Sequence, residues 1–340
     1  MYKIRKLDEQ AVENAEKKWN SIAKPLHSLG VFEEIVKNIA GIQGTQNIDI
    51  KKRCVLVMCA DNGVVCEGVT QTGQEVTAVV TENFAKGATS VCAMARNIGA
   101  DVVPIDVGVA RDVDGVINKK ISYGTKNMLH EKAMTYEQAE EAVQVGIDCV
   151  KELSEKGYKI IVTGEMGIGN TSSSSLWMTC FTGIPLDQCV GAGSGLNHQG
   201  INHKYEVLKR SLEQYPGEHS AEEILCRFGG YEMVMAVGAM LKAAELGMVI
   251  LIDGFIMTNC ILAASRLYLE VMSYAIFGHQ GDESGHKLLL DYLGARPLLN
   301  LGLRLGEGSG SVCAYPIVDS AVKMLNEMDS FAHASITKYF

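Results

Sequence analysis

The chain has 340 residues, of which 47% are hydrophobic and 21% are charged, and its formal net charge is −9. This composition is typical of a globular protein with one large domain or two smaller ones. The acidic balance argues against a nucleic-acid-binding protein, and no apolar run free of glycine and charge is long enough to predict a membrane span.

Cysteine and histidine usage predicts neither disulfides nor a metal centre. None of the ten cysteines forms a C-x-x-C pair, and several lie inside apolar runs, where a thiol behaves as a small hydrophobic group. The N-terminus has no signal-peptide pattern, so we expect a reduced, cytoplasmic protein. His279 and His286 are seven residues apart, but no histidine pair has the spacing of a metal-binding motif.

In chain order, the first predicted elements are two polar helices within residues 8–40, joined near Pro25. No strand precedes them, so we expect a small helical subdomain or a dimerisation arm. Six short strands follow, most of them continuous apolar runs: Cys54–Ala60, Val102–Val107, Ile160–Thr163, Val249–Ile252, Tyr274–Phe277 and Leu299–Leu305. Continuous runs are typical of a parallel sheet that helices cover on both faces.

One crossover between strands is well marked. Thr135 and Gln138 form a capping-box pattern, and apolar residues then recur at spacings of three and four as far as Leu153. Gly157 ends this predicted helix shortly before the strand that starts at Ile160. Residues 111–133 show the least patterning and are predicted to form a surface loop.

Polar residues and glycines follow all six predicted strands. In open parallel sheets, ligands bind beyond the carboxyl ends of the strands. The sequence therefore predicts a single polar crevice lined by these endings: Asp61-Asn62-Gly63, Asp106-Val107-Gly108, Gly164–Gly167, Asp253-Gly254, His279-Gln280-Gly281 and Gly306–Gly310.

The most informative ending spans residues 164–175, Gly-Glu-Met-Gly-Ile-Gly-Asn-Thr-Ser-Ser-Ser-Ser. It lies between two apolar runs, which predicts a strand, a glycine-rich turn and a helix start. Free N–H groups at such a helix start suit a phosphate, and Glu165 adds a carboxylate for chemistry or for a sugar hydroxyl. The alternative is a tight turn that binds no ligand.

Glu307 is a candidate general base. It lies between Gly306 and Gly308, after the last predicted strand. A partly desolvated carboxylate at such a place has a raised pKa, which suits proton abstraction. The alternative is that Glu307 caps the helix predicted to begin near Ser309.

A second glycine-rich loop, Gly191–Asn197, is followed by Lys204. Alternate glycines expose backbone N–H groups, and a nearby lysine can complete a phosphate cradle. The spacing is not that of a dinucleotide fingerprint, and no clear strand precedes the loop. The alternative, which is the more common one for a lone lysine, is that Lys204 is a solvated surface residue.

The loop Asp61–Thr77 is also rich in polar groups. Gln74 could serve there as a neutral hydrogen-bond partner for a heterocycle. The alternative places Gln74 in the first turn of a helix that begins near Thr72.

Together these segments resemble the nicotinate-nucleotide:5,6-dimethylbenzimidazole phosphoribosyltransferase family, whose members activate the lower-ligand base of cobalamin. The blocks Gly-Glu-Met-Gly-Ile-Gly-Asn-Thr and Gly-Glu-Gly-Ser-Gly are highly specific in combination. The resemblance runs from about residue 10 to 330 and is carried by Asp61–Thr77, Gly164–Ser173, Gly191–Asn197 with Lys204, Asp253-Gly254-Phe255, His279–His286 and Leu305–Gly310.

The resemblance implies an in-line displacement. Nicotinate leaves nicotinate mononucleotide, a benzimidazole nitrogen attacks the ribose C1′, and Glu307 removes the N–H proton of the incoming base. The reaction needs no cofactor or metal. The remaining implied roles are phosphate and nucleotide binding by Glu165, Gly167, Gly191, Gly193, Ser194, Gly195 and Lys204, an acceptor-base pocket of Gln74, Met166 and Leu305, and possible secondary roles for Asp253 and Gly281.

The implied fold is α/β, with a doubly wound, Rossmann-like parallel sheet of about six strands. Residues 1–45 and 311–340 would form a small helical domain, and residues 46–310 the catalytic domain. The family resemblance also implies a homodimer that acts on small-molecule substrates, without a nucleic-acid or membrane partner.

Three departures from the family pattern lie near the acceptor pocket. Asn62 stands where histidine is usual, Thr70–Gln74 replaces a Ser-x-x-Pro-Gln type segment, and Gly281 replaces a common serine. Another benzimidazole, a purine or a phenol therefore stays open as the acceptor.

Two other classes of protein fit the sequence less well. A nicotinamide-dependent oxidoreductase would need a G-x-G-x-x-G turn after the first strand, and the chain has Asp61-Asn62-Gly63 there. A non-catalytic nucleotide-binding protein would be expected to lack Glu307 or the glycine loops, and the chain has both.

Overall fold

The computed structural model describes residues 2–340, and these contain one six-stranded sheet in which all strands are parallel. The strand order is β3-β2-β1-β4-β5-β6. The chain first adds β2 and β3 on one side of β1, and then adds β4, β5 and β6 on the other side. This order confirms the predicted doubly wound fold. The strands are β1 (Arg53–Ala60), β2 (Asp101–Gly108), β3 (Ile117–Asn118), β4 (Ile160–Met166), β5 (Val249–Ile252) and β6 (Ala275–Phe277).

The structure corrects two predictions, one of a strand and one of a loop. The predicted strand at Leu299–Leu305 makes a single bridge, between Leu299 and His279, and is otherwise an irregular segment. Gly302 has a φ of +66°, which turns the chain out of extended geometry, and Leu305 is 54% exposed. Conversely, the predicted loop 111–133 contains the edge strand β3, which pairs with β2 through only two residues.

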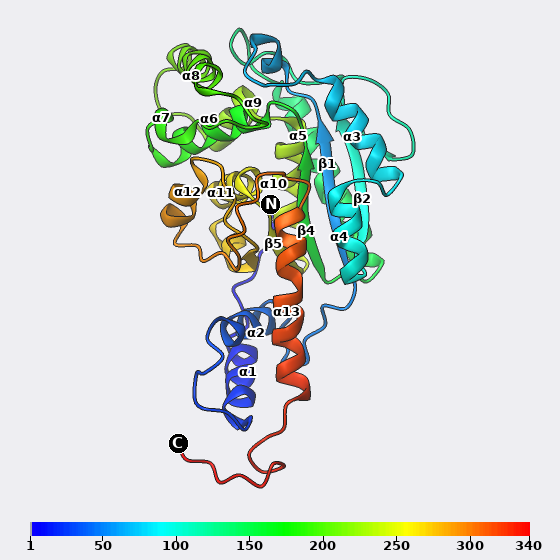
Figure 1. Cartoon of the computed structure of the whole chain (residues 1–340), viewed down its shortest axis with the longest axis vertical. Helices are drawn as coiled ribbons and strands as arrows, with labels where there is room; N and C mark the ends of the chain where they lie inside the picture. Colours follow the sequence, from blue (N-terminus) through cyan, green and yellow to red (C-terminus); the bar gives the residue numbers. More distant parts are fainter. Residues whose placement is uncertain (1) are drawn as a thin grey trace.

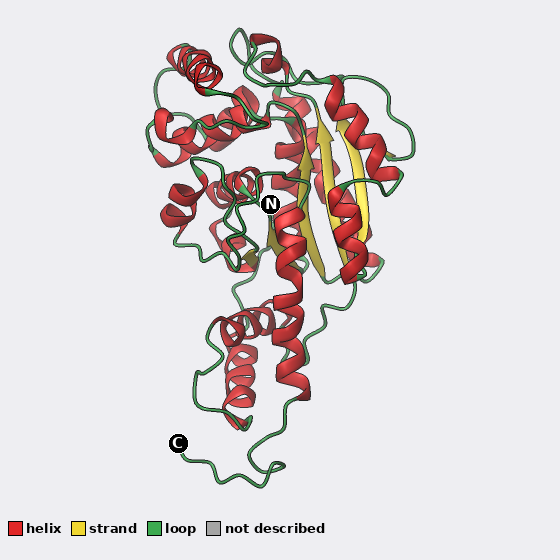
Figure 2. Cartoon of the chain, viewed as in Figure 1, coloured by secondary structure: helices red, strands yellow, loops and turns green. Residues whose placement is uncertain are grey.

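Helices cover both faces of the sheet (Figures 1 and 2). Helices α3 (Glu75–Ala85), α4 (Ser90–Ile98) and α13 (Ser309–Glu327) pack on one face. Helices α10 (Tyr231–Glu245) and α11 (Phe255–Leu267) pack on the other, with α5 (Tyr136–Glu155) against α10. Nearly every residue of α10 is buried, which explains why its sequence is apolar on all sides.

The two predicted N-terminal helices are confirmed as α1 (Glu9–Ser21) and α2 (Val31–Gln43). They pack against each other and beside α13, which runs from the sheet into this helical lobe (Figure 1). An antiparallel bridge between Ile22 and Ser330 ties the two ends of the chain together. The buried ion pair of Lys24 with Glu33, at 2.7 Å, fixes the connection between α1 and α2.

The remaining helices surround the carboxyl edge of the sheet or flank α11. They are α6 (Asn170–Thr182), α7 (Leu186–Cys189), α8 (His198–Glu213), α9 (Ala221–Phe228) and α12 (His286–Leu293), with the 3₁₀ turns η1 (Gly63–Glu67) and η2 (Leu269–Tyr274). The predicted capping box of α5 is present, because Thr135 and Gln138 exchange side-chain-to-backbone hydrogen bonds. Among residues 2–340, the helices lack the length and apolar character needed to cross a bilayer.

Candidate active site

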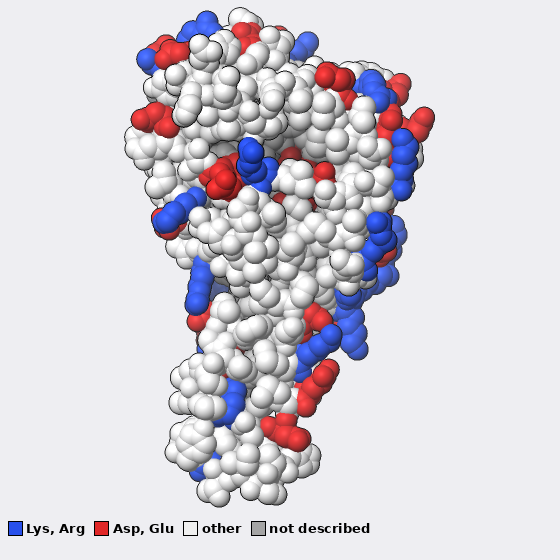
Figure 3. Space-filling view, viewed as in Figure 1, with Lys and Arg blue, Asp and Glu red and all other residues white. Residues whose placement is uncertain are grey.

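A cavity opens at the carboxyl edge of the sheet, beyond β4 and β5. Figure 3 shows a hollow in the surface of the large lobe, with acidic and basic side chains around it. The cavity is lined by the turns after β4 and β5, the second glycine-rich loop and the segment before α13. The structure thereby brings together seven of the residues singled out in the sequence: Glu165, Met166, Gly167, Gly193, Ser194, Asp253 and Leu305.

The turn after β4 presents a buried carboxylate beside an open helix start. Asn170 Nδ2 donates to Glu165 Oε2 at 2.5 Å. Burial raises the pKa of Glu165 to about 8, and the neighbouring carboxylates add to this shift. Gly169, with a φ of +94°, precedes α6 without any side-chain cap. The N–H groups of Asn170 and Ser172 donate to the carbonyl oxygens of Gly167 and Gly169, and the helix start at Asn170 and Thr171 lines the cavity, where the helix dipole favours an anion.

Gly167 lies where no larger residue fits. A Cβ there would lie 2.5 Å from Glu232 Oε1 and 2.7 Å from the carbonyl oxygen of Ala60. The glycine therefore lets the turn pack directly on β1 and α10, which fixes the position of Glu165 relative to the sheet.

Lys204 is a fully buried cation, so the surface-lysine alternative is wrong. Its Nζ donates to Thr171 Oγ1 at 2.8 Å and to the carbonyl oxygen of Gly191 at 3.4 Å, and it forms no ion pair among the described residues. Burial lowers the pKa of Lys204 to about 7. A Cβ on Gly193 would lie 3.4 Å from Nζ, so the amine lies directly behind the loop that lines the cavity.

Glu307 lies beside the cavity, next to the lining residues Leu305 and Gly306. Its backbone N–H donates to the carbonyl oxygen of Glu165 at 3.2 Å, and its Oε2 accepts from the N–H of Val91, also at 3.2 Å. Burial raises the pKa of the Glu307 carboxyl, and the bond from Val91 opposes this shift. The alternative role as the cap of α13 is wrong, because the N-cap of that helix is Gly308 and no side chain caps it.

Glu307 has left-handed backbone geometry, with a φ of +64°. Such a conformation is strained for a residue other than glycine and is retained mostly at functional sites. Gly164 makes it possible, because a Cβ there would lie 2.4 Å from the carbonyl oxygen of Glu307. The turn after β4 and the turn before α13 therefore touch through their backbones.

Asp253 holds the start of α13. Its Oδ2 accepts from the N–H of Gly308 at 3.2 Å and its Oδ1 from the N–H of Ser311 at 2.9 Å. These bonds anchor the turn that carries Glu307. Both carboxylate oxygens of Asp253 are therefore engaged with the backbone of this turn.

Several other candidate residues lie outside the lining of the cavity. Gly191 and Gly195 belong to the second glycine-rich loop but do not line the cavity, and neither does Gly281. A Cβ on Gly281 would lie 2.6 Å from Glu283 Oε2, so a serine here would require Glu283 to move. Gln74 directly precedes α3, which begins at Glu75 rather than near Thr72, and donates through Nε2 to the carbonyl oxygen of Asn62 at 3.1 Å.

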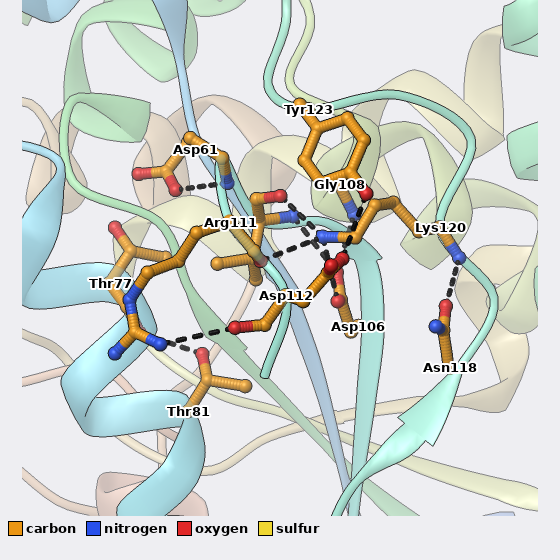
Figure 4. Close-up of polar contacts among 12 residues, drawn as sticks. Asp61, Thr77, Thr81, Asp106, Gly108, Arg111, Asp112, Asn118, Lys120 and Tyr123 are labelled. Carbon is orange, nitrogen blue, oxygen red and sulfur yellow. Dashed lines mark hydrogen bonds and ion pairs between the residues drawn. The ribbon is translucent and has the colours of Figure 1, made fainter. Parts of the chain in front are cut away.

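The strand endings on the β1–β2 side do not join the crevice, contrary to the sequence expectation. Figure 4 shows Asp61 and Asp106 turned toward the loop that follows β2. Asp61 Oδ2 accepts from the N–H of Ala110 at 2.7 Å, and Asp106 forms a buried ion pair with Lys120 at 2.8 Å. Lys120 also donates to the carbonyl oxygen of Arg111 at 3.0 Å. These carboxylates organise the loop.

Sequence reasoning missed Glu232, a fully buried acid near the start of α10. Its Oε1 accepts from Asn62 Nδ2 at 3.0 Å, and burial raises its pKa to about 7. The available signal was a single acid at the start of the apolar run Tyr231–Leu241, directly after Gly229-Gly230. In the part of the chain that the structure describes, no three acidic, cysteine or histidine side chains cluster as a metal site would require.

Comparisons with known proteins agree along the whole chain. A family model described as Phosphoribosyltransferase matches residues 4–336. The chain is similar to the nicotinate-nucleotide–dimethylbenzimidazole phosphoribosyltransferase of Bacteroides fragilis, with 52% identity over 100% of this chain and 99% of that protein. The enzyme of the same name from Parabacteroides distasonis is 54% identical over 95% of this chain and 94% of its own. The crystal structure of CobT from Thermus thermophilus matches with a TM-score of 0.92 and 32% identity, over 97% and 100% of the two chains.

Proposed function

Because this chain belongs to the nicotinate-nucleotide–dimethylbenzimidazole phosphoribosyltransferase family, we propose that the cavity beyond β4 and β5 is the site of that transfer, with Glu307 as its general base. The enzyme moves the phosphoribosyl group of nicotinate mononucleotide to 5,6-dimethylbenzimidazole, as its relatives' names state. The products are nicotinate and α-ribazole 5′-phosphate, an intermediate of cobalamin assembly.

The observation that carries the site assignment is the buried amine of Lys204, which forms no direct ion pair in residues 2–340 and has only the more distant Glu283 as an acidic neighbour. A buried cation without a counter-ion is costly, and a bound anion removes that cost. The 5′-phosphate of the donor supplies this anion, held by Lys204, by the loop at Gly193 and Ser194, and by the first N–H groups of α6. Gly191 and Gly195 give this loop its shape.

Glu165 and Gly167 are placed against the ribose. The Glu165 carboxyl lies at the end of β4, lines the cavity together with Gly193 and Ser194, and can accept a hydrogen bond from a ribose hydroxyl. Asn170 holds both residues, because its Nδ2 donates to Glu165 and its backbone N–H donates to the carbonyl oxygen of Gly167, so the sugar is oriented by a rigid turn. Orientation of this kind contributes much of the rate in reactions that join two substrates.

The displacement then follows from the arrangement. A ring nitrogen of the acceptor attacks C1′ from the face opposite nicotinate, and the C1′–N bond of the donor breaks with its electron pair going to the pyridine nitrogen. Inversion converts the β-nucleotide to an α-nucleotide. Glu307 takes the proton from the other ring nitrogen of the acceptor, and its raised pKa suits this role near neutral pH.

The acceptor base is placed between Met166 and Leu305, with Gln74 as its polar partner. Met166 and Leu305 line the cavity, and the 54% exposure of Leu305 leaves an apolar surface that an aromatic ring would cover. Gln74 lies at the start of α3, outside the lining of the cavity.

The structure also supports proposals about assembly. Residues 1–45 and 311–340 are proposed as a helical domain and residues 46–310 as the catalytic domain. The helical lobe extends away from the sheet (Figure 1) and is proposed as the arm of a cytoplasmic homodimer. Sedimentation of the intact chain and of a chain altered at this lobe would test the dimer.

The first test is incubation of the purified protein with nicotinate mononucleotide and, separately, with 5,6-dimethylbenzimidazole, benzimidazole, adenine and phenol. Nicotinate release together with an α-nucleotide would support the proposal, and the product ratios would give the preferred acceptor. Absence of nicotinate release with every acceptor would contradict it.

A further inference from the structure

Glu232 and Asn62 face each other in the interior and share one hydrogen bond. Asn62 Nδ2 donates to Glu232 Oε1 at 3.0 Å. The other two oxygens, Glu232 Oε2 and Asn62 Oδ1, are buried and have no donor among the described residues. A Cβ on Gly230 would lie within 2.7 Å of all three oxygen atoms, so the two unpaired oxygens lie on the same side of this contact.

Two acceptor oxygens facing each other without a donor are unfavourable in the interior. A single proton on Glu232 Oε2 removes both defects, because the carboxylic acid then donates to Asn62 Oδ1 while Oε1 accepts from Nδ2. The acid and the amide form a closed pair with two parallel hydrogen bonds. The complete burial of Glu232 favours the same neutral form, since a carboxylate would lose its hydration.

The Asn62 backbone connects this pair to the acceptor pocket. Its carbonyl oxygen accepts from Gln74 Nε2 at 3.1 Å. A backbone carbonyl can only accept, so the nitrogen of the Gln74 amide must face it and the amide oxygen must point elsewhere. The Asn62 backbone therefore fixes the orientation of the Gln74 side chain.

We propose that Glu232 is a positioning residue of the acceptor site: as a neutral acid it locks Asn62, and the Asn62 carbonyl in turn holds the Gln74 side chain at that site. This rests on the proposed function for the identity of the acceptor. The pair itself does not depend on that identity, because it is defined by atoms of the protein alone.

The test compares two substitutions of the same length. Glu232→Gln reproduces the neutral acid, because its amide accepts from Asn62 Nδ2 and donates to Asn62 Oδ1. Glu232→Met fills the space but makes neither bond. The KM for dimethylbenzimidazole is expected to rise about tenfold in Glu232→Met and to stay within about threefold of wild type in Glu232→Gln, with the KM for nicotinate mononucleotide changed less than about threefold in both.

Two controls separate positioning from general damage. Met240→Leu alters another fully buried side chain of α10 and should leave both KM values unchanged. Asn62→Leu keeps the backbone carbonyl but removes the side-chain pair, so it should reproduce the acceptor-specific effect even if Glu232→Met folds poorly. The double variant Asn62→Leu/Glu232→Met should be no worse than either single change, because both remove the same contact.

Three results would overturn the proposal. One is an equal rise of the KM for dimethylbenzimidazole in Glu232→Gln and Glu232→Met, which would mean that the ionised carboxylate is needed. Another is an equal rise of both KM values in Glu232→Met. The third result needs no activity measurement. Infrared spectra of the ¹³C-glutamate-labelled wild type at about pH 6 would show no protonated-carboxyl band that disappears in Glu232→Gln. Failure of wild type to release nicotinate would instead contradict the proposed function.

Discussion

Replacing Lys204 with methionine should make the protein more stable and less able to bind its donor. Burial lowers the pKa of Lys204 from its usual 10.5 to about 7. Because one pKa unit corresponds to about 1.4 kcal/mol, this shift costs the folded state about 4 kcal/mol at pH 7. Methionine removes that cost but loses the bonds to Thr171 and Gly191, at about 1 kcal/mol each. The net gain is about 2 kcal/mol.

The sign of the pH dependence follows from the direction of the shift. Between about pH 7 and 10.5 the unfolded chain binds a proton at Lys204 that the folded chain lacks, so this residue makes stability rise with pH in that window. Lys204→Met should abolish this contribution. Donor binding shows the opposite trend, because the phosphate needs the protonated amine, and wild-type affinity should therefore fall as pH rises above about 7.

Two measurements check this prediction. Denaturant unfolding at several pH values gives the stability, and donor KM or direct titration with nicotinate mononucleotide gives the affinity, which should fall about 10- to 100-fold in Lys204→Met. Lys209→Met, on the exposed side of the same helix, is the matched control and should change neither quantity. Unchanged donor affinity in Lys204→Met would remove Lys204 from the phosphate site, and a large loss of stability would refute the reasoning about its burial.

The other predictions concern the turn around Glu307. Glu307→Gln should lower kcat by about 10²- to 10⁴-fold while donor binding persists, as measured by initial rates and titration; near-normal turnover would move the base elsewhere. Since burial raises the pKa of Glu307, activity should fall as pH decreases through a value above 4.5, and the residual rate of Glu307→Gln should lack this acidic limb. Glu307→Gly should abolish turnover yet raise the free energy of unfolding by about 1 kcal/mol, because glycine tolerates a φ of +64°; lower stability would show that the turn is not strained. Gly164→Ala should push this turn away, since its Cβ would lie 2.4 Å from the Glu307 carbonyl oxygen, and should reduce kcat more than donor affinity. Full activity in that variant would argue against close contact between the two turns.

Much of the architecture was determined by the sequence alone. Five of the six predicted strands are present, because their continuous apolar runs can only be buried between two layers of helices. The helix start at Thr135 and the two N-terminal helices were likewise set by local capping and periodicity. The glycine-rich segments marked the turns after β4 and before α13, because glycine permits backbone geometry and contacts that other residues disfavour.

Some local patterns pointed the wrong way. Leu299–Leu305 has the composition of a strand, but Gly302 adopts left-handed geometry and the segment forms part of the cavity wall. The short strand β3 left no signal, since two exposed residues have no periodicity that a sequence pattern can show. In both cases contacts with neighbouring segments of the same protein, rather than local conformational preference, determined the structure.

Burial of charge was decided only by the tertiary structure. The local sequence around a lysine on a helix, or around a glutamate before an apolar run, is the same whether the side chain is solvated or buried. Packing of α8 against the loop at Gly193 made Lys204 an unpaired interior cation, and packing of α10 beneath Asn62 enclosed Glu232. Desolvation depends on every atom around a group, most of them distant in the chain, so the altered pKa values of these residues arise from the fold as a whole.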